Sequence, residues 1–142
     1  MVDLEALFPK LIGSPYSITS SPTQDYNCIA WAAGDDKRWW WPDLAMLRYW
    51  PAGVPRIETL SAFQTAFETL GYALCVDEQH EAGYEKIAIF ADDEGPQHAA
   101  RQLANGRWTS KLGELDDIEH DLHDLECADH GTVVVIMKRA IS

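Results

Sequence analysis

Two side chains of this sequence have the chemistry of a nucleophile and its base. Cys28 lies in the segment 25–32, where an N-cap at Asp25 predicts a short helix with the cysteine in its first turn. The free N–H groups and the dipole at a helix start favour a thiolate. His98 follows Gly95-Pro96 at the start of a predicted strand, where an imidazole can face a cleft and accept the thiol proton. The pair predicts a cysteine hydrolase or an acyl transferase; the alternative is a buried packing cysteine and a strand-end histidine.

The elements that must position this pair are predicted to be helices followed by a sheet. Apolar residues recur at helical spacing over 60–70, and Gly71 stands where a C-cap glycine belongs. A similar spacing over 115–125 predicts an acidic amphipathic helix. Strands are predicted at 72–76, 86–91, 97–103, 107–111 and 132–137, with a hairpin at Asn105-Gly106. Helices before an antiparallel sheet indicate an α+β fold, in one domain over residues 1–142.

Charge restricts the partners of this surface. The 142 residues include 23 Asp and Glu against 11 Lys and Arg, which gives a net charge of −12. A nucleic-acid backbone or an anionic membrane would be repelled, so neither is expected as a partner. Neutral substrates or basic proteins are favoured instead. The same acidity suits a non-catalytic binding protein, such as an immunity-type partner of a basic toxin.

Cysteine usage and the N-terminus indicate the compartment. Three cysteines at wide spacings predict reduced thiols rather than a disulfide framework or a zinc site. Glu119-His120-x-x-His123 lies in the acidic run 114–129, which is expected to be a solvated helix face, so no metal is predicted. The first residues lack the pattern of a signal peptide, and no apolar run is long enough for a membrane span. The protein is expected to be cytoplasmic, or exported without a classical signal peptide.

Several of these residues resemble a known superfamily. Cys28-Ile29-Ala30-Trp31-Ala32 resembles the Cys-x-x-aromatic-Ala helix start of papain-like enzymes. His98 with Asn105-Gly106-Arg107-Trp108 is similar to the histidine strand and glycine-turn hairpin of its NlpC/P60 and CHAP branch. The chain also resembles a bacterial family with the motifs YNCIAWA and HAARQL..GRWTSKLG. The resemblance implies a papain-like α+β fold, with N-terminal helices packed on a mostly antiparallel sheet. It also implies a peptidase, amidase or deamidase that cleaves peptide or protein amides through an acyl-enzyme intermediate, without a cofactor.

The resemblance also assigns roles to residues. Cys28 would be the nucleophile, and His98 the base and later the acid. The histidine-orienting residue of NlpC/P60-like patterns falls past the glycine turn, at Ser110 in this sequence. Hairpin geometry leaves that assignment open. A two-residue turn at Asn105-Gly106 puts Ser110 on the sheet face opposite His98, whereas a three-residue turn from Ala104 puts both on one face.

Further residues are expected to complete the site. The backbone N–H of Cys28 is the expected oxyanion donor, with a side-chain amide from Gln24 or Asn27 as the second. Asn27 can equally be a cap or turn residue. The aromatic side chains are expected to be core or cleft wall, with a stacking platform for sugar or peptidoglycan stems as the alternative. The predicted cleft residues are Trp31, Trp39, Trp40, Trp41 and Trp108.

Overall fold

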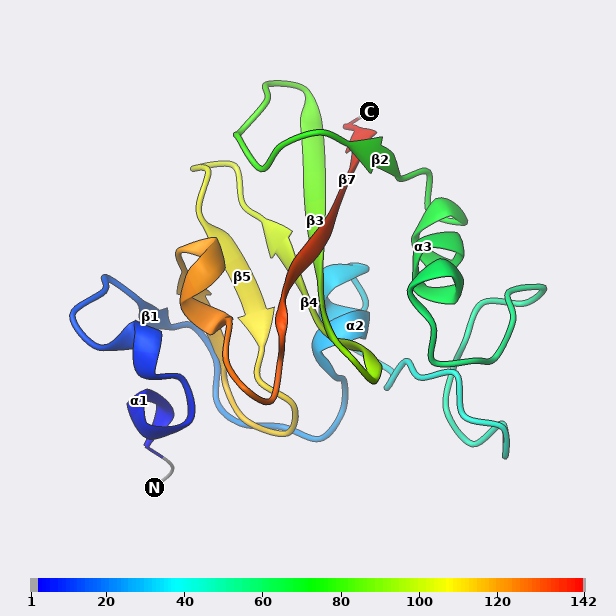
Figure 1. Cartoon of the computed structure of the whole chain (residues 1–142), viewed down its shortest axis with the longest axis horizontal. Coiled ribbons are helices and arrows are strands. Elements are labelled where there is room, and N and C mark those ends of the chain that lie inside the picture. Colours follow the sequence, from blue (N-terminus) through cyan, green and yellow to red (C-terminus); the bar gives the residue numbers. More distant parts are fainter. Residues whose placement is uncertain (1–2, 142) are drawn as a thin grey trace.

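A single sheet organises the chain. In this computed structural model, which describes residues 3–141, the strands form one seven-stranded antiparallel sheet in the order β1-β6-β5-β4-β3-β7-β2 (Figure 1). The strands are β1 (Ser17–Ile18), β2 (Ala73–Cys75), β3 (Tyr84–Asp92), β4 (Gly95–Gln102), β5 (Trp108–Lys111), β6 (Asp117–His120) and β7 (Thr132–Ala140). The long strands β3, β4 and β7 lie at the centre, and the shortest strands, β1 and β2, form the two edges.

Helices contribute little to the fold. They are α1 (Leu4–Leu7), α2 (Cys28–Ala32), α3 (Leu60–Glu68) and the 3-10 turns η1 (Pro9–Leu11) and η2 (Leu122–Leu125). Only 18% of the described residues are helical. The predicted papain-like α+β fold, with N-terminal helices packed on the sheet, is therefore wrong. None of the described helices is long and apolar enough to cross a membrane.

The acidic amphipathic helix predicted over 115–125 is also absent from these described residues. Their apolar spacing imitates a helix, but the chain forms strand β6 and then η2. Gly113 has a φ of 60° in the turn after β5, and it sends the chain back alongside that strand. Ser110 then pairs with Ile118 and Lys111 with Asp117. Pairing with a strand that is already in place satisfies the backbone, and it overrides the helical spacing.

Other predicted elements are confirmed. The helix predicted over 60–70 is α3, capped by the Thr59 hydroxyl at the Ala62 N–H and followed by Gly71 at a φ of 94°. The five predicted strands are β2, β3, β4, β5 and β7, with bounds within a few residues of those expected. The short helix that begins with Cys28 is α2.

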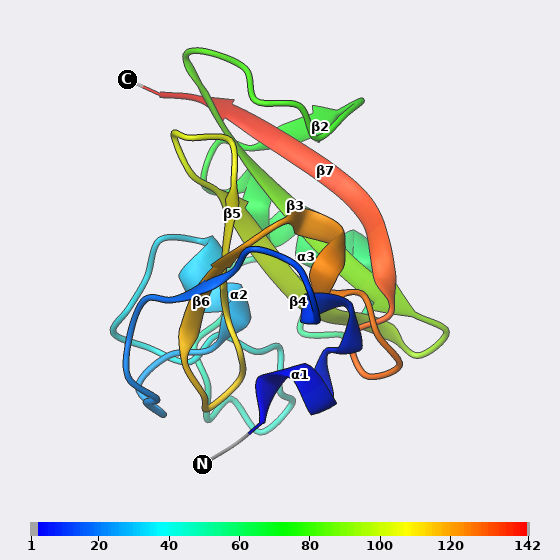
Figure 2. The same ribbon diagram turned by 90° about the vertical axis from the view of Figure 1, so that its left-hand side faces the viewer.

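The two faces of the sheet carry separate cores. Ile87 and Ile89 of β3 pack with α2 and α3 in one cluster. Ala88 and Phe90, the alternate residues of the same strand, pack with the N-terminal segment and η2 in the other. This alternation is the two-residue period of a strand. Figures 1 and 2 show α2 and η2 on opposite sides of the strands. Every residue of the sheet therefore belongs either to the α2 face or to the η2 face.

Candidate functional site

Cys28 is the first residue of α2, behind a cap formed by Asn27. The Asn27 side-chain oxygen accepts hydrogen bonds from the N–H groups of Ala30 and Trp40, both at 3.1 Å. Its side-chain nitrogen donates to the Trp40 carbonyl at 2.8 Å. Asn27, not Asp25, is therefore the N-cap, because its side chain reaches the N–H of Ala30 in the first turn. These bonds cap α2 and tie its start to Trp40 in the segment that follows the helix, so the Asn27 amide is committed to the backbone.

The Cys28 thiol is buried on the α2 face. Its residue is 8% exposed, and burial raises the pKa of the thiol to about 11. The backbone N–H groups of Ala99 and Ile29, with the Lys111 ammonium, lower that pKa by less than burial raises it. A helix of five residues supplies only a weak dipole. The thiol is consequently protonated at neutral pH, which is the opposite of the thiolate that the sequence predicts.

His98 lies on the η2 face. It pairs with Phe90 across β3 and β4, and the edge of one ring meets the other at a centroid distance of 5.0 Å. The His98 imidazole stacks on that of His130, with a distance of 4.1 Å between the ring centroids and an angle of 7° between the ring planes. The next residue, Ala99, packs with Cys28 on the α2 face. Successive side chains of a strand point to opposite faces, so the sheet separates Cys28 from His98. Within residues 3–141 no hydrogen bond joins the two.

Ser110 lies beside His98, because the hairpin between β4 and β5 has the three-residue turn. Gln102 pairs with Trp108, and the Gly106 N–H donates to the Leu103 carbonyl, so Ala104-Asn105-Gly106 is a three-residue turn. This turn puts Ser110 on the face of His98, with its hydroxyl 3.0 Å from His98 Nε2. The orienting residue that the resemblance implied for His98 therefore lies beside it, whereas the implied nucleophile, Cys28, lies on the other face of the sheet.

The hydroxyl of Ser110 joins two histidines in a directed chain of hydrogen bonds. It is also 2.7 Å from His120 Nε2, and His120 Nδ1 is 2.8 Å from the Asp121 carbonyl. A carbonyl only accepts, so His120 Nδ1 carries the proton. Neutral His120 then accepts at Nε2 from the Ser110 hydroxyl, and that oxygen accepts from His98 Nε2–H. Sequence reasoning missed His120 and His130 because both lie among carboxylates that suggest a solvated surface.

Burial keeps this histidine cluster, defined as His98, His120 and His130 with Ser110, uncharged. Burial holds the pKa of His98 well below its ordinary value, and the imidazoles of His130 and His120 lower it further. Burial also lowers the pKa of His120 to about 4, and it lowers the pKa of His130 below its ordinary value. The cluster is therefore a satisfied buried network at neutral pH. Glu119 and His123, the other parts of the predicted surface motif, form ion pairs elsewhere, with Arg107 and with Glu78 and Glu126.

The predicted tryptophan cleft is distributed over both faces. Trp40 belongs to the core of the α2 face and Trp108 to that of the η2 face. Trp31 and Trp41 pack partly buried against the α2-face core. Trp39 lines an open pocket of about 310 Å³ that Gln24 also lines, and neither Cys28 nor His98 lines it. The five side chains therefore do not form one wall.

A second buried polar group, which the sequence did not single out, shares the α2 face with Cys28. The Lys111 ammonium donates to the Thr23 carbonyl at 2.8 Å, and the Tyr26 hydroxyl donates to Asp117 at 2.7 Å. The other Asp117 oxygen has no partner among the described residues. Burial lowers the pKa of Lys111 and raises that of Asp117. The strand alternation that brings Lys111 to this face is the only signal that could have indicated the group.

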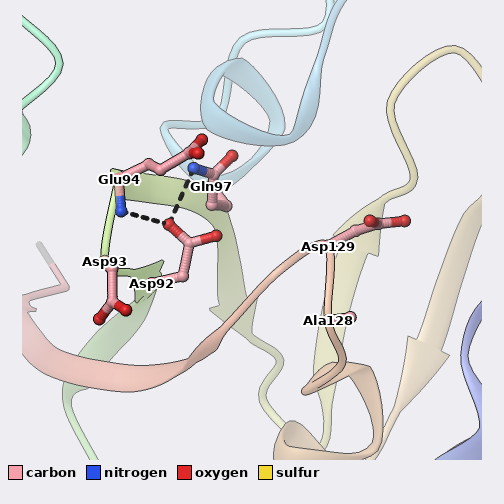
Figure 3. Close-up of a pocket in the computed structure, with 6 residues that line it drawn as sticks. All are labelled: Asp92, Asp93, Glu94, Gln97, Ala128 and Asp129. Carbon is pink, nitrogen blue, oxygen red and sulfur yellow. Dashed lines mark hydrogen bonds between the residues drawn. The ribbon is translucent and has the colours of Figure 1, made fainter.

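An open acidic pocket lies at the turn between β3 and β4. Its volume is about 480 Å³, and it is lined by Asp92, Asp93, Glu94, Gln97, Ala128 and Asp129 (Figure 3). The Asp92 carboxylate accepts from the Glu94 N–H at 2.9 Å and from the Gln97 side chain at 3.1 Å. Figure 3 shows Asp129 on the segment before β7, across from that turn. Of the ion pairs within residues 3–141, none involves these four carboxylates. Among the same residues, no three His, Cys, Asp or Glu side chains are placed to hold a metal ion.

The fold and these sites define a small antiparallel β-sheet domain with a sealed thiol, a buried histidine cluster and an open acidic pocket. The model of one family, described as a domain of unknown function (DUF7689), matches residues 17–138. The chain therefore belongs to the DUF7689 family. No curated protein and no solved structure matches the chain.

Proposed function

We propose that this protein is an acidic binding protein whose partner is a basic polypeptide. The observation that carries the proposal is the acidic pocket, because its four carboxylates have no cationic partner within the described chain. Elsewhere most cationic side chains are already used in ion pairs, such as those of Lys138 and Arg139. Carboxylates that line one concavity without a counter-charge favour a ligand that supplies several lysine or arginine side chains.

Two observations favour this function over a thiol hydrolase. The sheet lies between Cys28 and His98, so the imidazole has no route to the thiol proton. The thiol is also sealed and protonated, whereas a nucleophilic cysteine needs an accessible thiolate. A thiol peptidase or amidase would need a histidine within reach of the thiol and an accessible thiolate.

Binding is tested by neutralising the pocket. Asp93→Asn, Glu94→Gln and Asp129→Asn together keep the size of each side chain and leave the hydrogen bonds of Asp92 in place. The probe is a lysine-rich and arginine-rich peptide titrated calorimetrically at low and physiological ionic strength. We expect about tenfold weaker binding, because each exposed ion pair contributes about 0.2–1 kcal/mol. The affinity of the native protein should fall as salt is added.

A matched control removes the same charge elsewhere. Asp25, Glu68 and Glu114 are exposed carboxylates outside the pocket, and their triple amide variant has the same net charge as the pocket variant. If this control weakens binding as much as the pocket variant does, general acidity explains the interaction and the proposed site is wrong.

The hydrolase alternative is tested at Cys28 itself. Burial raises the pKa of this thiol from 9.0 to about 11, so its thiolate fraction falls about a hundredfold near neutral pH. We expect iodoacetamide to modify Cys28 at pH 8 only after denaturant is added, with mass spectrometry locating the label. Rapid labelling of Cys28 in the folded protein would instead support an activated thiol.

A further inference from the structure

One loop presents large apolar side chains to solvent. Leu44, Met46 and Leu47 are 84%, 70% and 83% exposed, and all three belong to the 42–48 loop between α2 and α3. Single exposed apolar residues are ordinary, but three within four positions form a patch of the kind that marks an interaction site. Figure 1 shows this segment standing away from the sheet.

Hydrogen bonds and an ion pair hold the 42–48 loop in the conformation that exposes Leu44, Met46 and Leu47. The Asp43 carboxylate accepts from the N–H groups of Leu47 and Arg48, at 2.8 and 3.1 Å, and forms an ion pair with Arg56 at 3.0 Å. Met46 has a φ of 58°, a left-handed conformation that costs a non-glycine residue about 1–2 kcal/mol. The hydrogen bonds to Asp43 sustain that strain, so the apolar side chains are presented by a fixed backbone.

Cationic side chains border the 42–48 loop. Lys37, Arg38 and Arg48 line one pocket together with Leu47, at an end of a chain whose net charge is −12. The Arg48 guanidinium lies over the Trp39 ring at 5.1 Å, and it forms no ion pair within residues 3–141. The 42–48 loop therefore combines exposed apolar side chains with the guanidinium of Arg48, which is unpaired among the described residues.

The chain also has a mostly apolar pocket that could receive the apolar side chains of such a loop. This apolar pocket has a volume of about 370 Å³ and lies between the N-terminal turns and the segment before β7. Leu7, 43% exposed, forms part of its wall, and Asp129 lines both this pocket and the acidic pocket, so the two pockets adjoin. Its lining is Ala6, Leu7, Pro9, Lys10, Glu126, Cys127, Ala128 and Asp129.

We propose that the apolar pocket receives the 42–48 loop of a second copy of this chain, with Arg48 of that loop facing Asp129. Apolar surface would meet apolar surface, and the Arg48 guanidinium would meet the Asp129 carboxylate, which forms no ion pair within residues 3–141. One molecule cannot make this contact with itself, because the loop and α1 lie at opposite ends of its longest axis (Figure 1). The contact is therefore head-to-tail, and it produces rings or chains rather than a two-fold dimer.

Sedimentation velocity tests the association at physiological ionic strength. The net charge of −12 on each copy opposes it, so concentrations from about 10 to about 500 µM cover the weak affinity expected. The mass of the native protein should rise with concentration. Leu44→Asp with Leu47→Asp should abolish the rise, and so should Ala128→Trp, which fills the pocket from an exposed position. Val76→Asp, at a 99% exposed residue outside both surfaces, should leave the rise unchanged.

Mixing the loop variant with the pocket variant gives the most decisive test of the proposed contact. The loop variant keeps an intact pocket and the pocket variant keeps an intact loop, so their equimolar mixture should form species of twice the monomer mass and nothing larger. A native protein that stays monomeric throughout overturns the proposal, and so does a mixture in which both variants remain monomers. Binding of the basic peptide is measured on dilute protein, so either result leaves the proposed function to its own test.

Discussion

Acidification is expected to destabilise this fold through its buried histidine cluster. His98 and His120 stay neutral in the folded protein, since burial holds the pKa of His98 well below its ordinary value and that of His120 at about 4. In the unfolded chain both imidazoles titrate near about 6.5. The unfolded state therefore binds more protons below that pH, and the free energy of unfolding falls as the pH is lowered.

The size of the effect follows from proton linkage. Between about pH 7 and pH 5, each histidine that stays neutral only in the folded state lowers the free energy of unfolding by about 1.9 kcal/mol. His98 and His120 together account for about 4 kcal/mol, a large part of the about 5–15 kcal/mol that stabilises a domain. Asp35, Asp43 and Asp77, whose pKa values are lowered, stabilise the fold above about pH 4 and lose that contribution only below it.

The His98→Gln variant isolates one imidazole. Glutamine keeps a donor for the Ser110 hydroxyl but does not titrate. Urea unfolding followed by tryptophan fluorescence at both pH values should show a change about 1.9 kcal/mol smaller than in the native protein, whatever the variant costs at pH 7. His80→Gln, at an exposed histidine outside the cluster, is the matched control. If His98→Gln shows the full native change, His98 titrates alike in both states and the reasoning fails.

Three further changes test the local structure by urea unfolding. Ser110→Ala leaves a donor and an acceptor of the buried imidazoles without partners, so we expect a loss of about 2–4 kcal/mol; a loss below 1 kcal/mol would contradict the hydrogen-bond chain. Gly131→Ala places a Cβ directly against the Ala91 carbonyl oxygen and should cost more than about 3 kcal/mol, whereas Gly113→Ala, at a similar positive φ with open space, should cost only about 1–2 kcal/mol. Asn27→Ala removes the cap of α2 and both side-chain bonds to Trp40 in the segment after the helix, and should cost about 2–4 kcal/mol; near-equal stability would show that the cap is dispensable.

Local sequence patterns predicted the elements whose signals lie within a few turns of chain. The apolar spacing over 60–70 and Gly71 predicted α3, and strand-like runs predicted β2, β3, β4, β5 and β7 but not β1 or β6. The short helix at Cys28 was also predicted, although its N-cap is Asn27 and not the expected Asp25. Residues 115–125 failed because pairing with β5, rather than their own spacing, decided their conformation.

The candidate site depended on information that local patterns do not carry. The sequence by itself determined the acidity of the surface, the thiol at the start of α2 and a hairpin at Asn105-Gly106. The structure decided that the hairpin has a three-residue turn, which places Ser110 beside His98. Only the tertiary structure decided that α2 packs on the face opposite His98, and that His120 and His130 gather beside it instead. The physical reason is that a one-residue step along a strand reverses the face, while the side on which a distant helix packs is set by burial over the whole sheet.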